Sequence, residues 1–204
     1  MIKIKWLGHA CYKIYFDDIQ CVIDPFEKGY VPGYRDISTS ADIVLASHTH
    51  NDHYGLGEVQ QLLRMVHGVN VTKVDTFHDD AGGTLRGKNI VHILEYNGVK
   101  IAHFGDIGHI LTAEQLQQIG DIDVALVPIG GTYTVRAPEA KTICQQVNAK
   151  VIIPMHYRAG EQGFNVLETT EEFESLFDNV KHYDSDEYTV PQQIVPEVAV
   201  LTYK

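Results

Sequence analysis

Hydrophobic and polar residues alternate along the first quarter of the chain, in short runs that are typical of β-strands. The runs are IKIKW (residues 2–6), CYKIYF (11–16) and IQCVIDPF (19–26). A period of two places successive side chains on opposite faces of a sheet, so each run predicts a strand. Glycine and aspartate residues separate the runs, as turns require. The pattern therefore predicts a meander of three strands.

The middle of the chain combines apolar runs with one helical period. Residues 41–48, ADIVLASH, form an apolar run that ends at a histidine cluster, which predicts a strand followed by a loop. Residues 58–66, EVQQLLRMV, carry apolar residues at helical spacing and predict a helix. Further strands are predicted at residues 71–78, 89–96 and 99–104, the last two forming a hairpin around Asn97-Gly98.

Predicted strands and helices alternate in the second half of the chain. The helices are expected at residues 112–119, 137–148 and 169–177, and the strands at 123–129, 150–154 and 197–203. Thr112 and Gln115 form a capping-box pattern, and Pro138 suits the first turn of the second helix. The strand–helix–strand order over 123–154 predicts a β-α-β unit. We therefore expect a single α/β domain over residues 1–204.

The overall composition indicates an ordinary globular protein, with 44% hydrophobic and 21% charged residues. Cys11, Cys21 and Cys144 are odd in number, widely spaced and set in apolar segments. We expect them to be buried free thiols in a reducing compartment, which makes the cytoplasm the expected location. The N-terminal strand pattern differs from a signal peptide, and no apolar run approaches the roughly 18 residues that span a bilayer.

The formal net charge of −11 narrows the expected partners. Such a surface repels phosphate backbones and anionic lipid head groups, which disfavours nucleic acid or a membrane as the main partner. A small-molecule substrate is the expected partner. An anionic substrate stays compatible with this charge if a buried dication outweighs the global field locally.

The candidate chemistry begins with residues 46–55, ASHTHNDHYG. A chance His-x-His-x-Asp-His in this composition has odds on the order of one in several hundred. Imidazole and carboxylate are nitrogen and oxygen ligands for first-row divalent metals. His48 and His50 can converge on one ion, whereas Asp52 and His53 follow a turn and can point to a second. Four side chains cannot fill two coordination spheres, so further ligands are expected.

Three such residues follow other predicted strands. His78 ends the strand at 71–78, Asp106 lies in the glycine-flanked loop HFGDIG, and His156 follows the apolar strand in IIPMHY. The same placement, just past the carboxyl end of a strand, describes all three. The other isolated histidines, His67, His92 and His182, are expected to be surface or core residues. The cluster and its three partners predict a metal site with two ions.

The motifs HTHNDH, FH, GD and PMHY resemble those of the metallo-β-lactamase superfamily. WLGHAC, IDPF, GDIGH and LVPIGGTYT make the chain similar to a narrower branch, the small stand-alone metal-dependent hydrolases related to ascorbate-6-phosphate lactonase. The similarity runs along essentially the whole chain. It implies an α/β fold, a four-layer αββα sandwich of two βα halves, with the metals in the cleft at the edge of the sheets.

The resemblance also implies a distribution of the ligands. One ion falls on His48, His50 and His78, the second on Asp52, His53 and His156, and Asp106 bridges the two. No cysteine occupies a ligand position, so thiolate softness is not available to select zinc. Zinc is the first expectation, with manganese and iron as alternatives. The resemblance leaves room for a homo-oligomer.

Two ions roughly 3.5–4 Å apart would generate hydroxide from a bridging water at neutral pH. Asp52 would orient this nucleophile and take its proton, which makes it the expected catalytic residue. The predicted reaction is hydrolysis of an ester, lactone or phosphoester bond of a small metabolite.

Other residues are expected around the ligands. His9 and His103 are predicted to support the ligands or line the cleft, with a plain core position as the alternative. A ligand imidazole needs an outer partner that fixes its tautomer, and Asp24 and Asp79 are candidates. His109, in the loop after Asp106, faces either the substrate or solvent.

Residues 128–135, PIGGTYTV, form a further candidate loop. Its two glycines, Gly130 and Gly131, would let the backbone approach a ligand closely. Thr132 and Tyr133 would offer hydroxyls to the substrate, with a tight turn and a core tyrosine as the alternative. Two cations near the ligand loops, Arg136 and Arg158, would receive an anionic substrate group, and surface solvation is the rival expectation for each.

Three rival functions are weighed against hydrolysis. A non-hydrolytic metal-binding or redox protein of the same fold would be expected to have a flavin partner domain, which this sequence lacks. A nuclease would be expected to carry an RNA-gripping domain or a basic arm, whereas this chain is short and acidic. A binding module with structural metals fits poorly with a complete ligand set in an open cleft.

Overall fold

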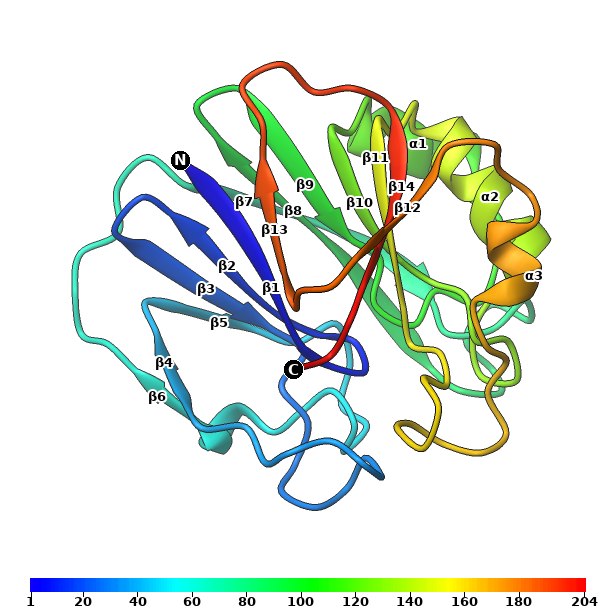
Figure 1. Cartoon of the computed structure of the whole chain (residues 1–204), viewed down its shortest axis with the longest axis horizontal. Coiled ribbons are helices and arrows are strands. Elements are labelled where there is room, and N and C mark those ends of the chain that lie inside the picture. The colour runs from blue at the N-terminus through cyan, green and yellow to red at the C-terminus, as the bar shows by residue number, and fades with distance from the viewer.

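Two β-sheets face each other and share one hydrophobic core (Figure 1). The computed structural model describes residues 1–204. The core contains 51 buried residues contributed by both sheets and by the helices. This shared core supports the expectation of a single domain. None of the helices is long and apolar enough to cross a membrane.

The five-stranded sheet contains the predicted N-terminal meander. Its strands, in spatial order, are β13 (Glu187–Val190), β1 (Ile2–Gly8), β2 (Cys11–Phe16), β3 (Ile19–Ile23) and β5 (Ile43–Leu45). β1, β2 and β3 are antiparallel neighbours, and β5 pairs in parallel with β3. The meander is confirmed, and β13 is an additional edge strand that the alternation pattern did not indicate.

The seven-stranded sheet joins the hairpin region to the β-α-β unit. Its order is β12 (Val180–Tyr183), β14 (Glu197–Leu201), β11 (Val151–Met155), β10 (Val124–Pro128), β9 (Val99–His103), β8 (Lys88–Tyr96) and β7 (Asn70–Phe77). Every residue of β10, β11 and β14 is buried, as continuous apolar runs predict for parallel strands covered on both faces. The β8–β9 hairpin is confirmed, with positive φ at Asn97 and Gly98.

The α-helices lie beside the seven-stranded sheet, on the right in Figure 1. They are α1 (Ala113–Ile119), α2 (Ala137–Gln146) and the four-residue α3 (Glu171–Glu174). The capping box of α1 is confirmed, because Thr112 Oγ1 accepts from the Gln115 backbone N–H and the Gln115 side chain accepts from that of Thr112. α2 connects the parallel strands β10 and β11, which confirms the β-α-β unit.

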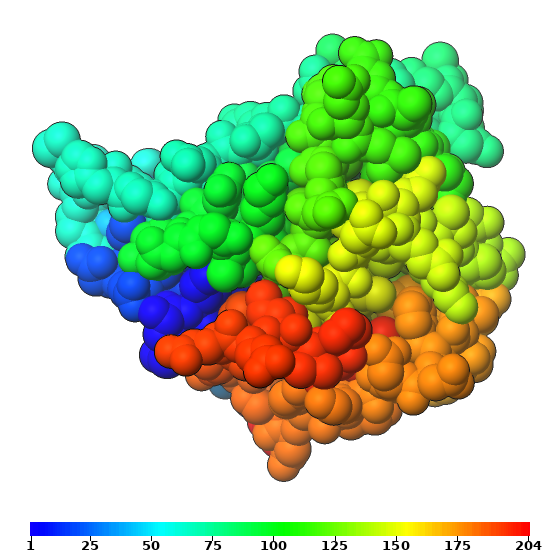
Figure 2. Space-filling view, turned by 90° about the horizontal axis from the view of Figure 1, so that it is seen from above, coloured from blue at the N-terminus to red at the C-terminus, as the bar shows by residue number.

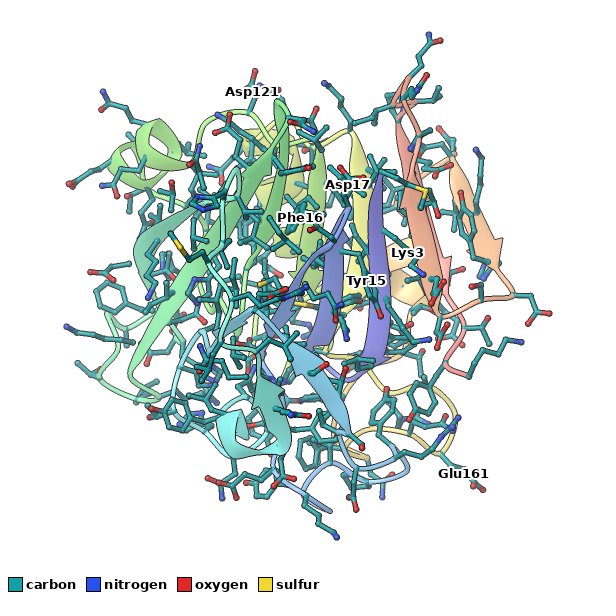
Figure 3. All side chains as sticks on the ribbon, turned by 90° about the vertical axis from the view of Figure 1, so that its left-hand side faces the viewer. Lys3, Tyr15, Phe16, Asp17, Asp121 and Glu161 are labelled. Atoms are coloured by element: carbon teal, nitrogen blue, oxygen red, sulfur yellow. The ribbon has the colours of Figure 1, made fainter.

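The outer face of the five-stranded sheet carries no α-helix. Lys3 and Tyr15 project from this face in Figure 3, and the Lys3 Nζ lies 4.8 Å from the centre of the Tyr15 ring. The short helix η1 (Leu56–Glu58) and the small sheet of β4 (Thr39–Ala41) and β6 (Val59–Gln61) occupy this side of the molecule (Figure 1). The predicted α/β sandwich is confirmed, with the difference that its α-helices all lie beside the seven-stranded sheet, so the α layer expected over the five-stranded sheet is absent.

The helix predicted at residues 58–66 is wrong. β6 pairs in parallel with β4, and Arg64 donates two hydrogen bonds of 2.7 Å to the Asp42 carboxylate. These contacts hold the segment extended, so the apolar residues do not share one face. Leu63 is 99% exposed. Figure 2 shows the teal segment that follows β6 projecting from the side of the molecule.

The late helix is shorter than predicted, and the long apolar run near residue 45 is interrupted. Residues 169–177 contain only the four residues of α3, whose first turn has no side-chain cap. Residues 41–48 contribute Ala41 to β4 and the three residues of β5, since the chain bends at Asp42 between the two strands. The strands β4, β6, β12 and β13 were not predicted from the sequence.

The strands that precede the candidate ligands all end, at their carboxyl ends, at one edge of the sandwich. β1, β3 and β5 run in one direction within their sheet, and β7, β9 and β11 share a direction in the other. Asp121, before β10, and Glu161, after β11, lie at opposite ends of the molecule in Figure 3. The loops at the Glu161 end carry the candidate ligands.

Candidate metal centre

The seven predicted ligands converge at this edge from four loops. They are His48, His50, Asp52 and His53 after β5, His78 after β7, Asp106 after β9 and His156 after β11. All except His50 are buried. The fold therefore brings these side chains together in space.

The first group consists of His48, His50 and His78. Their nitrogen ligand atoms all lie within 4.8 Å of one another. The ring centres of His48 and His50 are 4.7 Å apart, and those of His50 and His78 are 5.1 Å apart. Three imidazoles at this spacing can coordinate one divalent cation.

The second group contains Asp52, His53 and His156, together with His9. Their ligand atoms also lie within 4.8 Å of one another. The Asp52 Oδ2 lies 3.6 Å from His53 Nε2 and 3.8 Å from His156 Nε2. This is the grouping implied by the resemblance, with His9 added to it.

The Asp106 carboxylate lies between the two groups. Its Oδ2 is 3.2 Å from His78 Nε2 in the first group and 3.1 Å from His156 Nε2 in the second. Its Oδ1 is 3.2 Å from His53 Nε2. One carboxylate that contacts both groups is positioned to bridge two cations.

The donor atoms themselves show that the centre fits a cation. The Nε2 atoms of His48, His53 and His156 and the Oδ1 of Asp106 are buried and form no hydrogen bond. Buried polar atoms are almost always partnered, so four unpartnered atoms at one point need an explanation. A divalent cation supplies it, because all four atoms are nitrogen or oxygen donors with free lone pairs.

A hydrogen-bond network from Asp24 fixes the orientation of two of these imidazoles. Asp24 Oδ2 accepts from His53 Nδ1 at 2.8 Å and from the Ser47 hydroxyl at 2.6 Å. Since Ser47 donates to Asp24, its oxygen accepts from His48 Nδ1 at 2.9 Å. Both rings therefore carry the proton on Nδ1 and direct the Nε2 lone pair into the centre. The predicted role of Asp24 agrees with this geometry.

The backbone around the ligands is closely packed and locally strained. Asn89 accepts a hydrogen bond of 2.9 Å from the Asp106 N–H, and a side chain at Gly105 would meet the Asn89 Oδ1 at 2.3 Å. His9, Asp24 and His156 have φ between +51° and +53°, in the left-handed region that non-glycine residues rarely adopt. Such strain concentrates at functional sites.

Buried carboxylates give the centre a strong attraction for positive charge. Burial alone would lower the pKa of His156, but the Asp106 and Asp52 carboxylates raise it to about 9. Burial would raise the pKa of Asp106, but the imidazoles of His156 and His53 hold it well below its usual range. The field that holds protons on these imidazoles equally favours a metal cation in their place.

A cavity of about 440 Å³ opens over the ligands. Four predicted ligands reach it: His50, Asp52, His78 and Asp106. Its other walls include Tyr30, Arg86, Tyr133 and Phe164. This volume lies within the range of known small-molecule pockets.

The family of the chain follows from comparison with known proteins. Residues 3–156 match the family model of the beta-lactamase superfamily domain. The chain belongs to the metallo-β-lactamase superfamily. Its fold, two facing sheets with the ligands at their common edge, is the fold expected from the resemblance.

Individual relatives of this superfamily member are metal-dependent hydrolases. A UPF0173 metal-dependent hydrolase from Methanoregula boonei is 31% identical over 193 residues, covering 79% of this chain and 84% of the relative. A second, from Thermococcus onnurineus, is 28% identical and covers 77% and 85%. A crystal structure of a candidate zinc-dependent hydrolase from Thermotoga maritima is 37% identical, with a TM-score of 0.80 and 98% of both chains covered. These relatives place the chain among the metal-dependent hydrolases of the superfamily.

The two histidines expected near the ligands occupy different positions. His9 Nε2 lies 3.3 Å from Asp52 Oδ2, and its ring centre is 4.0 Å from that of His156. Burial lowers the pKa of His9 to about 4, so this ring is neutral at pH 7. His103 lies deeper, where its Nε2 donates to the Ala10 carbonyl at 2.8 Å. His9 therefore supports a ligand directly, whereas His103 packs in the core below Asp24.

Two other residues that were predicted near the ligands form hydrogen bonds with backbone groups instead of with the metal centre. His109 Nε2 accepts from the Phe77 N–H at 3.1 Å and its Nδ1 donates to the Ile110 carbonyl at 2.8 Å, so neither nitrogen is free for a substrate. The Asp79 carboxylate accepts four backbone N–H groups of its own loop. It makes no hydrogen bond to a ligand imidazole, so its predicted role as an outer partner is wrong.

The loop at 128–135 contributes one residue to the cavity. Tyr133 lines the cavity, but the Thr132 hydroxyl donates to the Val166 carbonyl at 2.7 Å. A side chain at Gly130 would lie 2.1 Å from the His156 carbonyl oxygen. The close approach that this glycine permits is therefore to the backbone of a ligand residue rather than to a substrate.

The positively charged side chain that lines the cavity is not one of the two arginines predicted from the sequence. Arg86 lines the cavity, whereas Arg136 and Arg158 do not. Tyr30 and Phe164 were also missed, because no local pattern distinguishes them. The signal for Arg86 was its position eight residues after His78, in the loop that begins with Asp79.

The three cysteines are free and buried, as predicted. Burial raises the pKa of each thiol well above its ordinary value. A protonated, buried thiol is a poor nucleophile and a poor ligand. Cys11, Cys21 and Cys144 therefore belong to the packing of the core.

Proposed function

We propose that this chain hydrolyses an ester, lactone or phosphoester bond of a small metabolite with the help of two divalent cations. The observation that supports two cations is the position of Asp106, whose carboxylate contacts histidines of both groups at 3.1 to 3.2 Å. A site for one cation would need only one of these groups.

The proposal assigns each ligand to a cation. His48, His50 and His78 would hold the first, and Asp52, His53 and His156 the second, with Asp106 shared. Imidazole nitrogens suit zinc, and manganese or iron fit the same set of nitrogen and oxygen donors. When bound, such a pair lowers the pKa of a water between the ions and polarises the substrate oxygen.

The chain itself supplies a base and a binding cavity. Asp52 borders the cavity, and its Oδ2 is held at 3.3 Å from the neutral His9 ring. Burial would raise the pKa of Asp52, but the nearby imidazoles of His53, His156 and His9 hold it far below its ordinary value. A carboxylate that is ionised at neutral pH can orient the attacking water and accept its proton.

The partner proposed for this site is a small molecule, and the net charge of −11 argues against nucleic acid or a membrane surface. Three free cysteines support a reducing, cytoplasmic location. A homo-oligomer is compatible with the proposal and does not enter the chemistry.

The test is hydrolysis of generic ester, lactone and phosphodiester substrates before and after removal of metal with a chelator. We expect turnover that the chelator abolishes and added zinc or manganese restores. Asp52→Ala and His156→Ala should abolish turnover with an unchanged circular dichroism spectrum, while the exposed His67→Ala keeps it. Full activity in either ligand variant, or in the chelated protein, would overturn the proposal.

A further inference from the structure

Arg86 gives the cavity a positively charged wall. We propose that Arg86 receives an anionic group of the substrate, a carboxylate or a phosphate, which makes the preferred substrate a small anionic ester or lactone. This inference rests on the proposed function and specifies the substrate class for it.

The position of Arg86 is fixed relative to a ligand. Its backbone N–H donates to Asp79 Oδ2 at 2.7 Å, and the Leu85 N–H donates to the same oxygen at 3.0 Å. The His78 N–H donates to the Gly87 carbonyl at 3.0 Å, which closes the loop directly behind Arg86. The guanidinium and the His78 imidazole are therefore carried by one closed loop.

The Arg86 guanidinium has N–H groups that form no hydrogen bond within the chain. Its Nη2 donates to the Thr132 carbonyl at 3.1 Å, and its Cζ lies 5.9 Å from the centre of the Tyr133 ring. No carboxylate of the chain forms an ion pair with it, although the protein has 27 acidic residues and 16 basic ones. An arginine held over a cavity without an acidic partner is suited to bind a carboxylate or phosphate from solution.

The other residues that line the cavity indicate which kind of group the rest of the substrate carries. Tyr30 and Phe164 line the cavity with Arg86, and their ring centres are 6.1 Å apart in an edge-to-face arrangement. Two aromatic rings provide an apolar surface for the body of a small molecule. A substrate that contacts Arg86 can thus place its apolar part on these rings and its scissile bond near Asp52.

Binding of unreactive analogues tests the inference without turnover. N-phenylsuccinamate carries a carboxylate, N-phenyl-3-phosphonopropanamide a phosphonate, and N-phenylsuccinamide is the neutral counterpart. Each is titrated by calorimetry into the metal-loaded protein, the Arg86→Gln variant and the Arg136→Gln control, whose arginine lies outside the cavity. The two charged analogues distinguish a carboxylate from a phosphate as the preferred group.

We expect at least one charged analogue to bind about 10- to 100-fold more tightly than the neutral one. Arg86→Gln should remove this preference, and Arg136→Gln should keep it. A preference that is absent from the wild type would show that the cavity has no anion subsite, and a preference that survives in Arg86→Gln would place the anion on the metal centre instead. Either result would overturn the inference.

Hydrolysis of the matching phenyl esters separates this inference from the proposed function. A charge preference in binding without hydrolysis of any ester supports the role of Arg86 and counts against the hydrolase proposal. Ester hydrolysis without a charge preference supports the hydrolase proposal and counts against the role of Arg86.

Discussion

Asp24 Oδ2 accepts a hydrogen bond of 2.8 Å from His53 Nδ1 and one of 2.6 Å from the Ser47 hydroxyl. Asp24 follows β3, whereas Ser47 and His53 belong to the loop after β5, the parallel neighbour of β3. The pairing of two strands therefore sets the tautomer of a ligand. This link connects the stability of the sheet to the affinity for metal.

Replacement of Asp24 should weaken metal binding more than it weakens the fold. In Asp24→Asn the amide oxygen can accept only part of the network, so the His53 ring loses its fixed orientation. Outer partners of this kind typically contribute 10- to 100-fold to metal affinity, and we expect about that loss in a chelator competition titration. Asp123→Asn, which removes the ion pair with Lys150 and leaves an amide oxygen that can still accept from the Lys100 N–H, is the control. Unchanged zinc affinity in Asp24→Asn would contradict the assigned role.

His9 should affect catalysis more than metal content. His9→Phe keeps a ring beside His156 but removes the nitrogen that lies 3.3 Å from Asp52 Oδ2. We expect kcat to fall about tenfold or more while the metal content per chain stays at the wild-type value. The check is metal analysis by mass spectrometry alongside steady-state kinetics. Loss of one metal equivalent would instead make His9 a ligand.

Asp79 should control the order of the loop that carries Arg86. Burial would raise the pKa of Asp79, but hydrogen bonds from Arg86, Gly83 and two further N–H groups lower it to about 2. A depressed carboxyl pKa stabilises the folded loop above about pH 4, and this contribution disappears as the pH falls toward 2. Asp79→Asn should therefore speed amide hydrogen exchange at Gly83 and Arg86 at neutral pH. Unchanged exchange at these two amides would show that the loop is held by other contacts.

Leu63 should contribute nothing measurable to stability, although the sequence pattern places it on the buried face of a helix. At 99% exposure it loses no contact when it becomes polar, so Leu63→Gln should change the free energy of unfolding by less than about 0.5 kcal/mol. Leu126→Ala, in the fully buried β10, should cost about 2–5 kcal/mol. Urea unfolding of the two variants compares them directly, and a large loss in Leu63→Gln would indicate that residue 63 is buried.

The sequence predicted the candidate ligands because their positions follow from strand ends. His78, Asp106 and His156 each lie within three residues of the carboxyl end of a strand, and strands that run in the same direction bring such residues to one edge. The other four candidate ligands lie together in the cluster at residues 48–53. These are local features, visible without knowledge of which strands become neighbours.

The errors arose where distant contacts decide the structure. The helical spacing at 58–66 is overruled by the pairing of β6 with β4, to which the ion pair between Arg64 and Asp42 adds. Arg86 and Phe164 reach the cavity only because their loops meet across the sheet edge. Asp79 has the residue type of an outer partner, but the N–H groups of its own loop satisfy it first.

The number of cations bound per chain tests the central claim most directly. Native mass spectrometry of the protein, purified without chelator and then reconstituted with excess zinc, counts the bound ions in the intact molecule. We predict two zinc ions per chain, because the Asp106 carboxylate contacts histidines of both groups. One ion or none at saturating zinc, unchanged when manganese or iron is supplied instead, would contradict the dinuclear centre.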